Sequence, residues 1–91
     1  MSNATVYCKA PAGDVARLLG DLSQYEEVSD ENDLYDDYAS LVEIWEPTDA
    51  AALKRAEVTA EILTSHGIAV GISTNSDPEP YAPTVASSVA A

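Results

Sequence analysis

The stretch LVEIWEPTDAAALKRAEVTAEILTSHG, residues 41–67, contains the clearest structural signals in this chain. Residues 41–46 are mostly β-branched, apolar or aromatic and alternate in part, and Pro47 follows them, so they predict a strand. Thr48 or Asp49 then supplies the side-chain oxygen that typically caps the start of a helix. A strand followed at once by a long helix is therefore the centre of the predicted fold.

The helix that follows is predicted by the spacing of its apolar residues and by the way it ends. Positions three or four apart are occupied by Leu53, Ala56, Ala60 and Leu63. Gly67 comes directly after His66 and suits the left-handed conformation found beyond helix ends. Residues 68–72, in which small and apolar residues alternate, predict a last strand.

The N-terminal part predicts one more strand and one more helix. Residues 4–9 form a short β-branched and aromatic run, and Pro11 and Gly13 end it. A helix over 14–24 is expected next, because one helical face collects Val15, Leu18, Leu19 and Leu22.

Negative charge is concentrated in one region of the chain. The 91 residues have a formal net charge of -12, and eleven of the sixteen acidic residues lie in 18–53, where there is no lysine or arginine. The densest part, 26–37, contains seven acids, closer together than the Debye length of about 8 Å at physiological salt. This balance excludes direct binding to nucleic acid or to anionic membranes, both of which need a cationic surface.

The dense acidic segment allows two structural interpretations. A helix capped by Ser29 would place Leu34, Tyr38 and Leu41 on one face, with Asp30 in its first turn where the helix dipole favours anions. A hairpin arm is the alternative, but its alternation segregates charged from apolar residues poorly. We favour the helix over 29–40.

These elements predict a single acidic domain over residues 1–75 and a flexible Pro/Ala/Ser tail over 76–91. The predicted order is β-α-α-β-α-β. The fold class is α+β, a small two-layer sandwich of ferredoxin-like or abbreviated type. Helices would lie on one face of a three- to four-stranded sheet.

No residue pattern points to catalysis, and we expect no enzyme, cofactor or metal site. His66, the single histidine, lies at a helix end, and Cys8 on the first strand is expected to be a buried small residue. The acidic segment departs from a calcium-binding loop at its third ligand, its glycine and its terminal glutamate. The four glycines fit no nucleotide-binding pattern.

The function that these features favour is that of an acidic, non-catalytic inhibitor. Such a protein would occupy the basic nucleic-acid-binding groove of a host enzyme complex as a DNA mimic, in the manner of an anti-restriction or anti-CRISPR protein of a phage or mobile element. It would act in the cytoplasm, without touching nucleic acid or membrane directly. The expected partner-binding residues are Glu26, Glu27, Asp30, Glu31, Asp33, Tyr35, Asp36 and Asp37.

Two alternatives remain open at this point. The chain could be a small regulatory or adaptor domain of a salt-adapted organism, in which acidity serves solvation only. It could also be a self-associating structural protein, a homodimer formed through a sheet edge or the alanine-rich helix.

Overall fold

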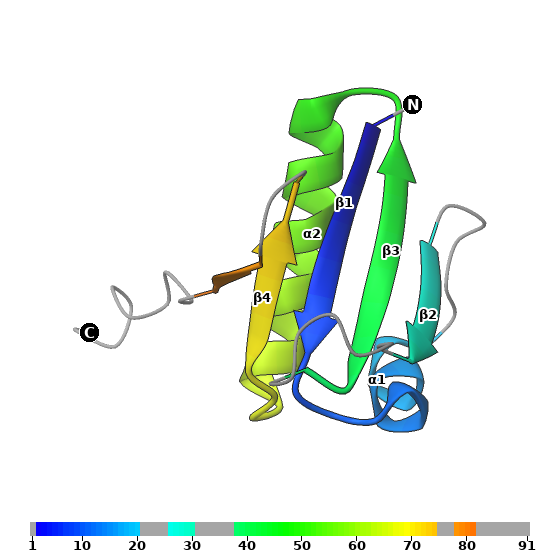
Figure 1. Ribbon diagram of the computed structural model, residues 1–91, viewed down its shortest axis with the longest axis vertical. Helices are drawn as coiled ribbons and strands as arrows, with labels where there is room; N and C mark the ends of the chain where they lie inside the picture. Colours follow the sequence, from blue (N-terminus) through cyan, green and yellow to red (C-terminus); the bar gives the residue numbers. More distant parts are fainter. Residues whose placement is uncertain (1, 21–25, 31–37, 75–77, 82–91) are drawn as a thin grey trace.

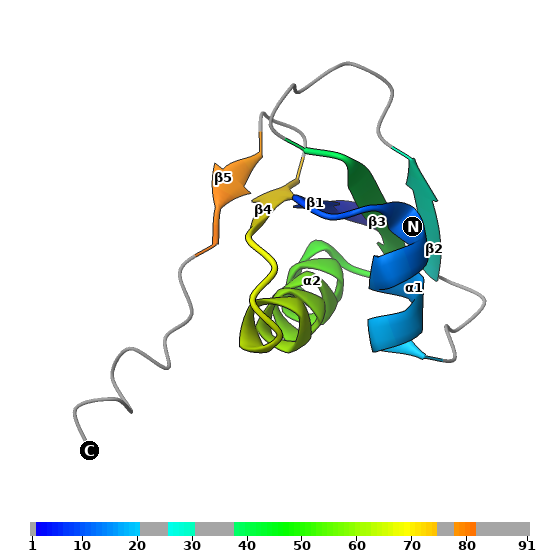
Figure 2. The same cartoon turned by 90° about the horizontal axis from the view of Figure 1, so that it is seen from below.

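A five-stranded antiparallel sheet with both helices on one of its faces forms the two layers of the protein (Figures 1 and 2). The computed structural model describes residues 2–20, 26–30, 38–74 and 78–81. In chain order the elements are β1 (Ser2–Cys8), α1 (Ala12–Leu19), β2 (Glu26–Asp30), β3 (Ser40–Glu46), α2 (Asp49–Ser65), β4 (Val70–Ser73) and β5 (Glu79–Pro80).

The strands lie in the order β2-β3-β1-β4-β5, and each neighbouring pair is antiparallel. Without β5, this is the β-α-β-β-α-β arrangement of ferredoxin-like folds, with β1 and β3 in the centre and a helix after each of them. The predicted α+β sandwich with helices on one face is thus confirmed. The sheet is larger than expected, because β2 and β5 add strands at its two edges.

The predicted helix over 29–40 is wrong where the structure describes it. Ser29 and Asp30 belong to β2, in register with Leu41 and Ser40 of β3. The pairing places Val28 beside Val42, where it packs against the core. Backbone pairing with a central strand and burial of this valine outweigh the local preference for a capped helix, whose formation depends on tertiary packing in any case. Residues 31–37 lie outside the described part.

The first helix is shorter than predicted. It ends at Leu19, and Gly20 follows with φ 71°, a left-handed conformation that stops the helix. Leu22 therefore falls outside it, in the range 21–25 that is not described. The end of α2 agrees with the prediction, since His66 is the C-cap residue and Gly67 has φ 83°.

The core lies between the sheet and the helices. Alternate residues of β1 point into it, namely Ala4, Val6 and Cys8, and each is fully buried. The sheet-facing side of α2 consists largely of buried small residues, which let the helix axis approach the strands closely. These are Ala52, Ala56, Thr59 and Ala60.

The fifth strand arises within the segment expected to be a tail. Glu79 and Pro80 pair with Ile72 and Gly71, and the Tyr81 amide donates a hydrogen bond to the Val70 carbonyl. Proline is compatible with such an edge position because an edge strand needs hydrogen bonds on only one side. Residues 82–91 lie outside the described part.

Candidate functional site

The face of the sheet opposite the helices, here called the open face, carries polar and aromatic side chains in two transverse rows. The strand registers place one row across β2, β3, β1 and β4, consisting of Glu27, Glu43, Thr5 and Ser73. The next row consists of Ser29, Leu41, Tyr7 and Gly71. Trp45 and Asn3 are paired beyond the first row, and Trp45 is half-buried.

The most unusual feature of the open face is an acidic pair, Glu27 and Glu43, on neighbouring strands. The two residues are direct cross-strand partners, and neither takes part in an ion pair within the described residues. Like charges directly opposite each other destabilise a sheet. The pair therefore costs stability in the free protein, and a cation placed above it would relieve that cost.

An aromatic cluster lies beside the acidic pair. The rings of Tyr7 and Tyr38 are 5.7 Å apart between centroids and tilted by 51°. The Lys9 ammonium lies 5.6 Å from the centre of the Tyr38 ring, within the range of a cation–π interaction. Tyr38 lies over Gly71, which has no β-carbon to obstruct the phenol group. The open face thus combines rigid aromatic surface with two carboxylates that form no ion pair with any described residue, a composition suited to recognition.

The structure separates the two glutamates that begin the predicted partner-binding set. Glu26 turns toward the helices, where its Oε2 lies 3.9 Å from Arg55 Nε and its side chain is 10% exposed. Arg55 Nε also lies 3.6 Å from Glu46 Oε2. Glu27 is exposed on the opposite face of the same strand. Glu26 is thus engaged within the protein, whereas Glu27 is available to a partner.

Of the other predicted partner-binding residues, the structure describes Asp30 alone. Asp30 is exposed at the end of β2, where the strand leaves the sheet edge. The others lie outside the described residues: Glu31, Asp33, Tyr35, Asp36 and Asp37.

The predicted partner-binding set does not include four residues of the open face, Tyr7, Glu43, Trp45 and Tyr38. The signal for three of them is the alternation within β1 and β3, where every second residue is buried. The residues between them must then lie on the other face. Tyr38 had no such signal, because its position depends on contacts with β1 and β4.

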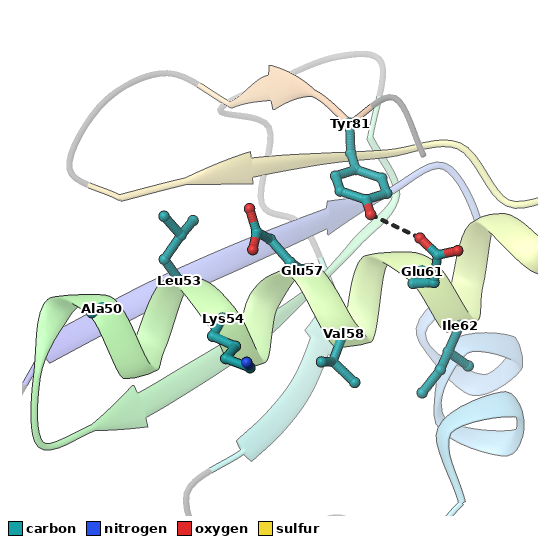
Figure 3. Close-up of a pocket in the computed structure, with 8 residues that line it drawn as sticks. All are labelled: Ala50, Leu53, Lys54, Glu57, Val58, Glu61, Ile62 and Tyr81. Carbon is teal, nitrogen blue, oxygen red and sulfur yellow. Dashed lines mark hydrogen bonds between the residues drawn. The ribbon is translucent and has the colours of Figure 1, made fainter. Parts of the chain in front are cut away.

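A second surface feature is a groove of about 580 Å³ on the outer side of α2 (Figure 3). Its lining is mainly apolar and consists of Ala50, Leu53, Lys54, Glu57, Val58, Glu61, Ile62 and Tyr81. Tyr81 Oη donates a 2.8 Å hydrogen bond to Glu61 Oε2, which joins Tyr81 to α2 within the lining of the groove. This hydrogen bond is the main cause that raises the pKa of Tyr81 above its ordinary value, and the negative charges of Glu61 and Glu57 add to it.

Cys8 and His66 differ in their exposure to solvent. Burial raises the pKa of the Cys8 thiol to about 11, although a hydrogen bond with Ser40 offsets part of the rise. The expectation of a buried small residue is confirmed for Cys8, which is fully buried. His66 is exposed at the end of α2. Within the described ranges, no group of three or more histidine, cysteine or acidic residues could hold a metal ion.

Comparison with known proteins yields no match, either to a protein-family model, to a curated protein or to a solved structure. Neither described helix is long and apolar enough to cross a membrane.

Proposed function

We propose that this chain is a non-catalytic protein-binding inhibitor, whose acidic open face and β2 edge occupy the basic nucleic-acid-binding groove of a host enzyme complex. In this role it acts as a DNA mimic of the anti-restriction or anti-CRISPR type. The observation that carries the proposal is the acidic pair of Glu27 and Glu43 on neighbouring strands of the sheet, to which no described lysine or arginine forms an ion pair.

The chemistry of the proposed contact is charge-assisted hydrogen bonding. Arginine and lysine side chains that normally bind DNA phosphates also bind carboxylates, and arginine does so in a bidentate manner. Asp30, exposed at the end of β2, adds a further carboxylate at that edge of the sheet. A protein partner needs such complementarity mainly for specificity and for rapid association.

The aromatic residues supply the part of the contact that does not depend on charge. Trp45 and Tyr7 are half-buried, so each presents part of a ring on the open face. Aromatic rings contribute rigid contact area and also stack on arginine guanidinium groups. We therefore expect the partner to place arginine residues, rather than lysine alone, against this face.

The test is affinity capture from nuclease-treated host lysate at moderate salt, followed by competition with duplex DNA. We expect a nucleic-acid-binding complex to be captured and then displaced by DNA. The Glu27→Lys/Glu43→Lys variant should lose this capture. Glu57→Lys/Glu79→Lys is the matched control, because it changes the net charge equally but alters exposed residues away from the open face.

Two results would count against the proposal. If the open-face variant captures the same complex as well as the control variant does, the open face is not the interface. If duplex DNA fails to displace the captured complex, the partner contacts this protein through a surface other than its nucleic-acid groove.

A further inference from the structure

The outer side of α2 carries the large hydrophobic residues that the structure describes as exposed. Leu53 is 40% exposed, Val58 47% and Ile62 38%. Isolated exposed apolar residues are common, but these three lie on one helix that also lines a groove, with Leu53 on the β5 side of the helix and Val58 and Ile62 on the side away from β5 (Figure 3).

Two rows of side chains, each spaced four residues apart, make up this surface. Leu53, Glu57 and Glu61 form the row beside β5, and Tyr81 hydrogen bonds to the last of them (Figure 3). Lys54, Val58 and Ile62 form the row that points away from β5 (Figure 3). The spacing of four residues aligns each row along the helix axis.

Lys54 and Glu61 become complementary when a second copy of this surface is turned around by a twofold axis, although Glu57 of each copy then also lies close to Glu57 of the other. Lys54 and Glu61 lie at equal distances on either side of the midpoint between Glu57 and Val58. When two copies of a helix pack antiparallel about a twofold axis at that midpoint, Lys54 of each copy lies opposite Glu61 of the other. Such an interface repeats each contact twice, so both ion pairs form together.

We propose that a second copy of this chain packs antiparallel against α2 and that the protein is a twofold symmetric dimer. Val58 lies near the axis and contacts its own counterpart, with Ile62 of both copies beside it. Leu53 of each copy enters the groove of the other next to Tyr81. Ridge-and-groove packing at interaxial distances of about 8–10 Å brings side chains at these positions into contact.

The fold keeps the open faces and the β2 edges of the two copies apart in this arrangement. The acidic pair lies on the open face, and both helices lie on the opposite face of the sheet (Figure 2). The strand β2 is also at the far edge of the sheet from β5 (Figure 1). Dimerisation through α2 therefore leaves the proposed partner-binding face free on both copies, and the two proposals stand independently of each other.

The experiment is a charge exchange followed by analytical ultracentrifugation over a range of protein concentrations. Lys54→Glu and Glu61→Lys alone should each weaken dimerisation by at least about tenfold, because each brings like charges together. The double variant Lys54→Glu/Glu61→Lys should restore most of the loss, because the ion pairs form again in reversed orientation. Lys9→Glu is the control, since it makes the same charge change as Lys54→Glu outside α2.

Two further variants separate the interface from effects on folding. Val58→Asp should abolish the dimer while leaving the far-ultraviolet circular dichroism of the monomer unchanged, because Val58 is largely exposed. Tyr81→Phe removes the hydrogen bond to Glu61 but keeps the ring, and it should leave the dimer intact. A wild-type monomer at all concentrations would overturn the proposal, and so would a dimer that Val58→Asp does not affect or a double variant that fails to recover.

Discussion

A hydrogen bond links Tyr81, the residue after β5, to Glu61 of α2. Because of this bond, we expect the free energy of unfolding to depend on pH in the alkaline range. The bond requires the protonated phenol, so the pKa of Tyr81 is raised in the folded protein. Its stabilising contribution is complete below the unfolded pKa of about 10 and is lost as the pH rises through the folded pKa.

We therefore expect Tyr81→Phe to lower the free energy of unfolding by less than about 1 kcal/mol at pH 7, since the residue is partly exposed. The difference between wild type and variant should vanish above the folded pKa. Urea unfolding at pH 7 and at strongly alkaline pH measures it. A difference that stays constant with pH would mean that the hydrogen bond is not the cause.

Gly71 is the residue that gives Tyr38 its place on the open face. A β-carbon at this position would lie 2.5 Å from Tyr38 Oη and 3.2 Å from Pro78 Cβ. We expect Gly71→Ala to cost about 1 kcal/mol or more, because Tyr38 must move and its contact with Tyr7 is disturbed. In a Tyr38→Ala background the same substitution should cost less, which a double-mutant cycle by chemical unfolding measures. Equal costs in both backgrounds would show that Pro78, and not Tyr38, is the obstacle.

At the scale of elements, the stability of α2 depends on the capping residue that directly precedes the helix. Thr48 is the N-cap, and its Oγ1 accepts a 3.1 Å hydrogen bond from the Ala51 amide. We expect Thr48→Ala to lower the free energy of unfolding by about 1 kcal/mol and Thr48→Ser to be nearly neutral, because serine caps helices equally well. Thermal unfolding followed at 222 nm measures both variants. A loss of similar size in Thr48→Ser would assign the effect to the methyl group instead.

The edge strand β2 is attached to the domain by its ladder with β3 and by one cation from α2. Arg55 lies between Glu26 and Glu46, whose side chains are 10% and 21% exposed. We expect Arg55→Met to speed hydrogen exchange of β2 amides more than that of β1 amides, since two largely buried carboxylates then lose the positive charge of Arg55 beside them.

The control for this prediction is Arg17→Met, which removes the exposed ion pair between Arg17 and Asp14 within α1. Exposed pairs contribute little to stability, so β2 should be unaffected in this variant. Equal exchange of β1 and β2 in Arg55→Met would show that β2 opens only with the whole domain.

At the scale of the whole molecule, the net charge of -12 opposes folding. Screening should relieve this cost over ordinary ionic strengths, because the Debye length falls from about 30 Å at 0.01 M to about 8 Å at physiological salt. We expect the thermal midpoint to rise up to a few hundred millimolar NaCl and then to level off. A midpoint that climbs steeply into the molar range of KCl would instead favour the salt-adapted alternative, in which acidity serves solvation.

Local patterns determined much of this architecture. Residues 41–67 predicted β3 and α2 with their ends, and the alternation and capping signals alone carried that information. The two-layer α+β class followed from the succession of strands and helices. The regional concentration of acidic residues is likewise fixed by the amino-acid sequence and does not depend on how the chain packs.

Only the tertiary structure decided where the charges and edge strands lie. Residues 26–30 have no strong local preference, and they form a strand because β3 offers an unpaired edge and the core accepts Val28. That pairing alternates Glu26 and Glu27 between opposite faces, so that one meets Arg55 and the other meets Glu43. The same holds for β5 and Tyr81, whose positions depend on β4 and on Glu61. Local sequence determines what a segment prefers in isolation, whereas partners distant in the chain determine which backbone edge it pairs with and which side chain its charge faces.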